Sequence, residues 1–560
     1  MNKPLLMSLA VAALLSGNAN AATMYDRFQA MEDEMKKLQT EITDLKAEKT
    51  VDEDADESEE VATVDSDDED ADESEDADDE GDDEDEDDED EMSFEEETEE
   101  SLEYFDKTLS QINKNTAGNH LKFSVDFRTT VDNLQYKMAG KNAAGEDTAG
   151  NDALLTNRLW LNMNWAANEH LSFTGQLAYN KAYGARSGYT GQIAGFETFD
   201  WITNENPYDD IVRVRSAYFF YRNDTFLGSD IPWTFSIGRR PSTNGHLINL
   251  REDDSAASPM GHTINVEFDG LSSKFSFEDL TGIDGMYVKF CAGRGGTNAG
   301  PKFFTVNPST ANTVNPITGS YATNSKDIPN IDLGGLIFVP YSDGQYSFAT
   351  QYYYAANLID ANVNPSTGQF LGMQTVGGMH SITANFVMNG IGNEWSDFLD
   401  ESMFFISGAT SITNPDAGQT MLGSSDRETG YSYWAGLQTP TFSENGRFGL
   451  EYNHGSQYWR SITYAEDTLS GSKVAARGDA YEAYWTEPIV DDILSIQLRY
   501  TYVDYAYTGS NGFFGSTTGT ATKITDIQAA AAAGDPRSIA AASQIVDTAQ
   551  DIRLYIRYRY

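Results

Sequence analysis

The connections between strand-like segments constrain this chain more than any other feature. From residue 119 onward, segments that alternate apolar and polar residues are joined by short and long connections in strict succession. The seven short turns lie near residues 166–170, 227–230, 280–285, 341–344, 392–397, 442–445 and 487–492. The eight long, polar connections lie near residues 131–153, 182–209, 241–269, 294–330, 357–376, 412–429, 457–477 and 508–549. This succession predicts sixteen antiparallel strands, with residues 262–292 the least certain because INVEFDG there could be strand or loop.

Each segment has one apolar and one polar face. In the last segment, Ile552 and Ile556 alternate with Arg553 and Arg557. Arginines opposite an apolar face are typical of a strand with lipid on one side and water on the other. A soluble β-sandwich also alternates, but it has no reason to sort its connections by length onto two ends. We therefore predict an all-β fold over residues 119–560, a transmembrane antiparallel β-barrel of about 16 strands with short periplasmic turns and long outer loops.

The end of the chain fits the closure of such a barrel. Both barrel ends fall on the short-turn side, so the last strand must pair with the first. Its apolar face finishes in aromatic residues, which resembles the signal that the outer-membrane assembly machinery reads. The residues that carry this predicted assembly signal are Ile556, Tyr558 and Tyr560.

Residues 1–21 have the pattern of a secretory signal peptide. Lys3 gives a positive start, Leu5 to Leu15 are apolar, and Ala19-Asn20-Ala21 is a small-x-small cleavage site. The predicted location is the cell outer membrane of a Gram-negative bacterium, with the segment after the signal peptide in the periplasm.

Residues 22–50 show a heptad repeat. Charged residues fill the positions between its apolar members, which predicts an α-helical coiled coil. The predicted seam consists of Phe28, Met31, Met35, Leu38, Ile42 and Leu45. Three heptads are marginal alone, so we expect self-association, and a barrel of porin size suggests a homotrimer. A single amphipathic helix lying on another surface is the alternative.

An acidic region follows the coiled coil. Residues 51–100 hold 34 Asp and Glu and no Lys or Arg, out of a formal net charge of -52 for the chain. Such a composition cannot bury a core, so residues 51–94 are predicted to be a disordered linker. Loose binding of Ca²⁺ or Mg²⁺ is the alternative, without EF-hand spacing. Residues 95–118 read as a short amphipathic helix.

Basic residues gather on the predicted inner face. Closure makes the last strand a neighbour of the first, so their cations form one ladder, and a second lies on the fourth and fifth strands. The predicted pore-lining residues are Lys122, Arg128, Arg158, Arg213, Arg215, Arg240, Arg499, Arg553, Arg557 and Arg559. Long loops supply acids, among them Glu252, Asp253 and Asp254. Either these loops fold inward and create a transverse field that selects solutes, or the charges pair and hold the barrel's shape.

No pattern for catalysis stands out. GxSxG, HExxH and Walker motifs are absent, and the single cysteine, Cys291, is expected to be a small packed residue rather than a nucleophile. We predict no enzymatic activity and no catalytic, cofactor or metal site. The acidic balance excludes nucleic acid as a partner, because phosphate binding needs a basic face.

Four phrases resemble a family of porin-like outer-membrane proteins of Gram-negative bacteria with an N-terminal coiled coil, catalogued as a domain of unknown function. These phrases are VDFRTTVDNLQY (125–136), RVRSAYFFY (213–221), SIGRRPSTNG (236–245) and DGMYVKFCAGRG (284–295). The resemblance implies the placement and the architecture, and it supplies no substrate. The resemblance to this family does not lead us to expect the acidic tract of residues 51–100.

Together these features predict an outer-membrane porin that passes ions and small hydrophilic solutes by diffusion. Its expected partners are outer-membrane lipid, the barrel assembly machinery and further copies of itself. The alternative is an anchor whose periplasmic coiled coil binds peptidoglycan or another envelope protein. A third reading is a barrel that sheathes a redox partner. The absence of CxxCH means that any haem would belong to that partner.

Overall fold

The computed structural model describes residues 121–184, 211–255, 257–300, 304–306, 317–319, 323–324, 329–363, 370–392, 395–443, 445–463, 468–510 and 520–560. The predicted signal peptide, coiled coil, acidic linker and short amphipathic helix lie outside these residues, so those four expectations stay predictions.

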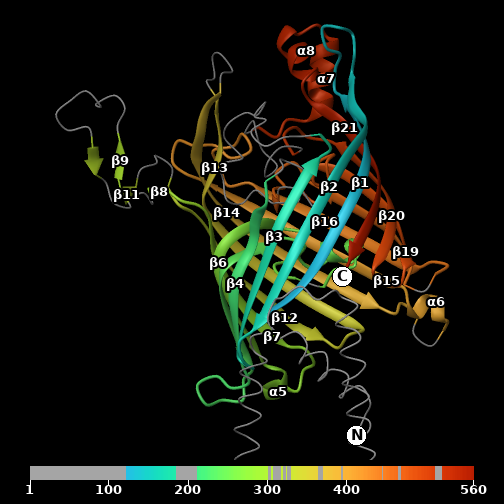
Figure 1. The fold of residues 1–560 in the computed structure, drawn as a ribbon. Coiled ribbons are helices and arrows are strands. Elements are labelled where there is room, and N and C mark those ends of the chain that lie inside the picture. Colours follow the sequence, from blue (N-terminus) through green and yellow to red (C-terminus); the bar gives the residue numbers. More distant parts are fainter. Residues whose placement is uncertain are drawn as a thin grey trace, which may run out of the picture. The chain divides into compact units, whose positions relative to one another are not determined.

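The described residues form a closed antiparallel β-barrel (Figure 1). The hydrogen-bonded sheet has 17 strands, of which the two-residue β18 (Ile462–Thr463) pairs in parallel with β6 and is not part of the wall, which leaves sixteen. The wall strands are β1 (Leu121–Met138), β2 (Thr148–Ala166), β3 (Leu171–Ala182), β4 (Arg213–Asn223), β5 (Trp233–Ser242), β6 (Ile264–Ser276), β7 (Tyr287–Gly296), β12 (Ile331–Ser342), β13 (Tyr346–Val363), β14 (Phe370–Asn389), β15 (Met403–Pro415), β16 (Thr429–Pro440), β17 (Arg447–Gly455), β19 (Gly478–Val490), β20 (Leu494–Tyr505) and β21 (Val546–Arg559).

The barrel closes where the sequence predicts. β21 pairs with β1 from Asp126 opposite Arg559 to Met138 opposite Val546. Because every wall strand has a neighbour on both sides, the wall has no edge with unpaired backbone groups, which a lipid environment requires.

Short helices and small hairpins occupy the connections. The helices are α4 (Ile248–Glu252), α5 (Glu278–Thr281), α6 (Asp397–Asp400), α7 (Ile524–Ala532) and α8 (Pro536–Ala542). The connection from β7 to β12 contains β8 (Ala299–Gly300), β9 (Phe304–Val306), β10 (Ile317–Gly319) and β11 (Thr323–Asn324). In Figure 1, α5 marks the end with short turns, and α7 and α8 stand at the opposite end.

All seven predicted short turns join consecutive wall strands, but three predicted loop boundaries are wrong. The loop expected at 131–153 spans only 139–147, and the one at 357–376 spans only 364–369, because the flanking strands continue further. Beyond the lipid a strand needs no apolar outer face, so polar runs such as the end of β1 still pair. The loop expected at 241–269 ends at Thr263, since INVEFDG belongs to β6.

The strands are apolar outside, and many of the inward side chains are polar or charged. On β20, Leu498 is 46% exposed on the outer face, whereas its neighbour Arg499 is 1% exposed on the inner face. On β2, Trp165 faces outward and Trp160 is buried inside. No helix in the described part of the chain combines the length and the apolar composition needed to cross a membrane.

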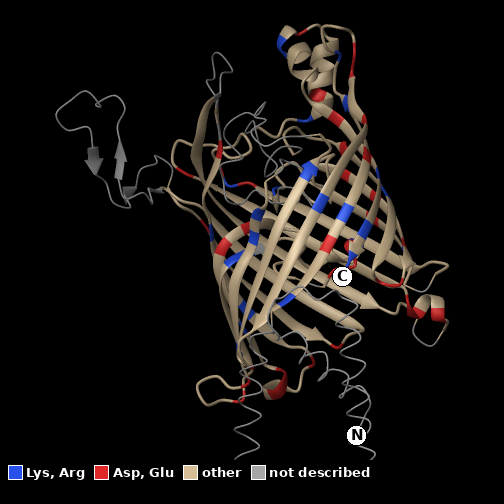
Figure 2. Ribbon diagram, viewed as in Figure 1, with Lys and Arg blue, Asp and Glu red and all other residues tan. Residues whose placement is uncertain are grey.

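The interior has two unlike halves. Behind β6, β12, β13 and β14 lies an apolar cluster that includes Val266, Ile337, Val339 and Met379. Behind β19, β20, β21, β1 and β2 the buried side chains include many arginines and acids. Figure 2 shows basic and acidic segments along the strands of the wall. This division sets the positions of the loops that enter the barrel.

Candidate functional site

The connection from β5 to β6, residues 243–263, folds into the barrel. Leu247 and Ile248 are buried against Val387, Phe405 and Trp434 of the opposite wall. The chain doubles back tightly at Gly245, where a Cβ atom would lie 1.9 Å from the Pro259 carbonyl oxygen, so only glycine fits there. We call this segment the inner loop.

The acidic tip of the inner loop lies against the arginine wall. Arg128, Arg499 and Arg557 reach the Glu252 carboxylate at 3.6, 3.3 and 3.9 Å, and the Tyr555 hydroxyl donates to it at 2.9 Å. Beside it, Arg557 pairs with Asp254 at 2.8 Å.

The other acid of the tip makes exposed pairs. Asp253 pairs with Arg559 at 3.3 Å and also with Arg447. In this contact, acidic residues of a long connection lie against basic residues of the strands, which is the arrangement that the sequence suggests.

The ion pairs continue across the interior as a chain of alternating charges. Arg251 links Glu252 and Glu482, each at 2.9 Å. Lys473 then links Glu482 and Glu451, the latter at 2.6 Å. We call this chain, with the arginines around Glu252, the luminal charge network. Nearly all its members are buried, and buried charges need such pairing because desolvation is costly.

The network reaches the first two strands through Asp126. Arg557 Nε donates to Asp126 at 3.0 Å, and Arg158 pairs with the same carboxylate at 3.3 Å. On the neighbouring level, Arg553 pairs with Asp132. Sequence reasoning named these arginines but missed Asp126 and Asp132. The alternation of β1 could have found both acids, since they share a face with Arg128.

The remaining predicted pore-lining residues differ in setting. Arg215 is buried, 3.7 Å from Glu267, and its guanidinium lies 4.3 Å from the Trp160 ring centre. Lys122 and Arg213 are exposed at the starts of β1 and β4, which lie at opposite ends of the barrel. The structure therefore brings six of the ten together at the tip of the inner loop and at Asp132, and places the others apart. These six are Arg128, Arg158, Arg499, Arg553, Arg557 and Arg559.

Arg240 differs from the paired arginines. It donates to the hydroxyls of Ser236, at 2.7 Å, and Ser272. Inside the barrel near it stand Lys274 of β6 and Lys289 of β7, which the sequence analysis did not single out. The alternation of side chains along β7 could have placed Lys289 inside, because its neighbours Val288 and Phe290 face outward.

Two cavities of about 500 Å³ each adjoin these cations. One is lined by Lys289 and Arg240 together with polar residues of β1 to β4. The other is lined by Lys289 and Lys274 together with residues of β12 to β15. Both touch Ala257 and Ser258 of the inner loop, so the loop lies at the boundary of both cavities.

His262 anchors the end of the inner loop. Its two ring nitrogens lie 2.8 Å from Ser407 Oγ and 2.9 Å from Ser432 Oγ. Trp434 and Trp459 meet the imidazole with T-shaped geometry. Complete burial lowers the pKa of His262 to about 3, so the ring is neutral at physiological pH.

A second connection, residues 456–477, also enters the barrel. Its β18 pairs with the start of β6, and Trp459, Val474 and Ala476 are fully buried. Burial lowers the pKa of Arg477 to about 9, and repulsion from Arg460 adds to the effect. Buried residues of this connection and of the inner loop therefore both occupy the barrel interior.

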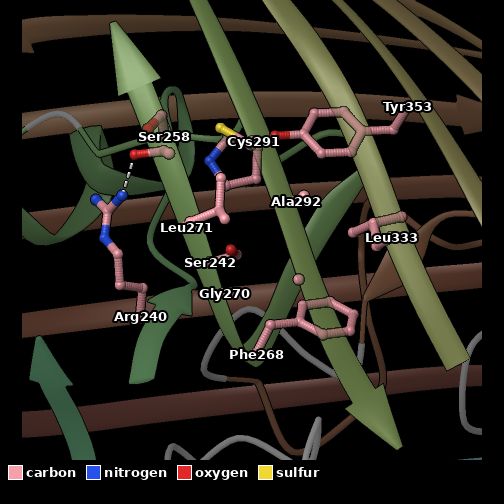
Figure 3. A pocket seen from close by; sticks show the side chains of 13 residues that line it. Arg240, Ser242, Ser258, Phe268, Gly270, Leu271, Cys291, Ala292, Leu333 and Tyr353 are labelled. Carbon is pink, nitrogen blue, oxygen red and sulfur yellow. Dashed lines mark hydrogen bonds between the residues drawn. The ribbon is translucent and has the colours of Figure 1, made fainter. Parts of the chain in front are cut away.

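Cys291 is a packed residue, as the sequence predicts. It contacts the apolar cluster from β7, and the Tyr353 side chain points toward it across a cavity of about 40 Å³ (Figure 3). Within the described ranges, no three His, Cys, Asp or Glu side chains are grouped to hold a metal ion.

Several solved outer-membrane structures share a remote likeness with the chain. OprB of Pseudomonas putida is 12% identical, with 81% of this chain and 97% of that chain covered and a TM-score of 0.41. OmpT of Vibrio cholerae is 12% identical over 79% of this chain and 97% of its own, with a TM-score of 0.39. An anion-selective porin from Comamonas acidovorans is 11% identical over 78% and 100%, with a TM-score of 0.37.

Sequence comparison gives a firmer result. No curated protein matches the chain. A family model does match, over residues 148–560, which is most of the barrel and well over half of the chain. The chain therefore belongs to the family described as "Protein of unknown function (DUF3373)".

Proposed function

We propose that this protein is an outer-membrane porin that lets ions and small hydrophilic solutes diffuse through its barrel. The observation that carries the proposal is the closed barrel of sixteen strands whose inner face carries many polar and charged side chains and encloses two cavities of about 500 Å³. Outer faces that are apolar on all sides suit lipid. An interior with solvent-sized space suits a channel.

The charge arrangement favours anions. The arginines at the tip of the inner loop are matched by Glu252, Asp126 and Asp254, so their field is largely cancelled. Lys289 and Arg240 adjoin the cavities and contact hydroxyl groups instead. A cavity with uncompensated positive charge raises the local concentration of anions.

The test is single-channel conductance of the chain without its predicted signal peptide in a planar bilayer under a salt gradient. We expect steady conductance steps and a reversal potential that indicates anion preference. A folded barrel without steps would refute the open porin. Native mass measurement on the same sample tests the proposed trimer, which monomers alone would refute.

A second function has one observation in its favour. The luminal charge network spans the interior from β17 to β2, and two connections fill the same space. A blocked barrel would serve as an anchor, with the predicted coiled coil binding peptidoglycan or an envelope partner. Deleting residues 22–100 separates the two: a porin keeps its conductance, whereas an anchor loses its partner in a peptidoglycan pull-down.

A further inference from the structure

Three cations on adjacent strands stand apart from the luminal charge network. Lys289 Nζ donates to Ser258 Oγ at 2.5 Å, and Arg240 donates to two serine hydroxyls while its Nε has no hydrogen-bond partner. Lys274 lies 4.2 Å from the centre of the Tyr287 ring. Among the described residues, no carboxylate forms an ion pair with Lys289 or Arg240, and Glu278 is the acid whose charge acts on Lys274.

An inward ammonium without a counterion is costly to maintain. Lys289 is partly buried and lies near the like charges of Arg240 and Lys274. Removing a charge from water is unfavourable unless the charge is paired. The barrel could have placed an acid there, as it does at Glu252, so the arrangement fits a site whose counterion arrives with a ligand.

The cavity lined by Lys274, Lys289 and residues of β12 to β15 indicates which other chemical groups the ligand has. Its basic part consists of Lys274 and Lys289, and the neutral ring of His246 also lines it, with an Nδ1 that has no hydrogen-bond partner. Its apolar part consists of Met260, Ile337, Val339, Val387 and Met403. None of the described residues that line it is Asp or Glu.

The cavity is large enough for an organic molecule and reaches the end of the barrel. About 500 Å³ is within the range of small-molecule sites. Gly344, in the turn between β12 and β13, and Asn389, at the end of β14, line it as well. It therefore extends toward the short-turn end.

We propose that this cavity binds an amphipathic organic anion, with a carboxylate at Lys289 and Lys274 and an apolar body against Ile337, Val339 and Met403. The carboxylate supplies the missing negative charge and the body covers apolar surface that would otherwise face water. The proposal names a solute class for the proposed porin and rests on that function for how the solute reaches the cavity. Binding itself needs no open channel.

Calorimetric titration of the chain in zwitterionic lipid nanodiscs tests the site. Benzoate is the probe, benzamide has the same shape without the charge, and acetate has the charge without the body. We expect benzoate to bind at one site, at least tenfold more tightly than benzamide, acetate or inorganic phosphate. Lys289→Met should weaken benzoate binding at least tenfold, and so should Lys274→Met. Lys523→Met, which changes an exposed lysine of the β20 to β21 connection, should leave binding unchanged.

The outcomes separate this site from the proposed function. Equal binding of benzamide, equal binding of phosphate, or unchanged benzoate binding in both lysine variants would overturn the site. Heat-modifiable mobility on gels shows whether each variant is folded. If the unsubstituted protein binds benzoate but conducts no ions, the anion site is supported and the porin function is refuted. If it conducts ions but binds no benzoate, the porin function is supported and the anion site is refuted.

Discussion

Neutralising Glu252 is the sharpest test of the luminal charge network. Three arginine side chains of the wall lie within 4 Å of its carboxylate, as does Arg251 of the inner loop itself. Glu252→Gln keeps the shape of the side chain and an oxygen that can accept from Tyr555. It removes one negative charge from a site that water barely reaches, since Glu252 is 5% exposed.

The size of the effect follows from which charges remain. After the change, Arg557 still has Asp126 and Asp254, and Arg251 still has Glu482. Arg128 and Arg499 each lose one carboxylate, at 3.6 and 3.3 Å. Removing one partner of a buried ion pair costs about 3–5 kcal/mol, because the other charge stays in a poorly solvated place. We expect the free energy of unfolding of Glu252→Gln to fall by that amount.

Denaturant unfolding in lipid vesicles, followed by tryptophan fluorescence, measures this loss. Trp434 and Trp459 are fully buried in the barrel, so their emission reports on its interior. The matched control is Asp332→Asn, which breaks the Arg294 pair of 2.6 Å on exposed side chains and should cost less than about 1 kcal/mol. If Glu252→Gln cost no more than the control, the tip of the inner loop would not be held by its charges.

Two further predictions concern pH. For His262, whose folded pKa of about 3 lies below the ordinary 6.5, the unfolded chain binds the extra proton, so stability should fall by up to about 1.4 kcal/mol per pH unit as pH drops between these values. His262→Gln should remove that slope in unfolding midpoints measured from pH 7 to 4, and an equal slope in the variant would contradict the assignment. Arg477, with a folded pKa of about 9 against 12.5, should make the barrel more stable as pH rises above 9. Arg477→Met should remove this gain, and unfolding midpoints measured from pH 8 to 10 check it, since an equal gain in the variant would contradict the assignment.

The wall could be predicted from the sequence because the lipid imposes a simple rule on it. Each strand must show an apolar outer face, and each turn at the periplasmic end can be short. The same alternation places Arg128 and Arg499 inside, where the structure has them. The rule fails at the outer end of β1, where Asn133 and Gln135 make side-chain hydrogen bonds to Asp152 and the strand continues past the lipid.

The filling of the lumen could not be predicted in the same way. On β12, Ile337 and Val339 face inward and Leu336 and Phe338 face outward, so both faces are apolar. Alternation then gives no sign that the inner face packs against a loop. The partner of each buried charge is equally hidden, because Glu252 and Arg557 are 305 residues apart in the sequence and only the fold brings them together. Lys289 was missed since a lone lysine on a strand looks like an ordinary polar position.

The inner loop is held by apolar packing and by ion pairs, and these two attachments bear on where a solute would pass in the proposed porin. Leu247 and Ile248 are fixed by apolar packing, and Glu252 is fixed by buried ion pairs, which salt screens much less than exposed ones. Neither attachment yields to ordinary changes of ionic strength, so the loop stays across the barrel. The two cavities that share Ala257, Ser258 and Lys289 lie beside it. Because Lys289 lines both cavities, we expect substitutions there to change the selectivity of the proposed porin more than changes in the arginine wall, whose charges are already matched.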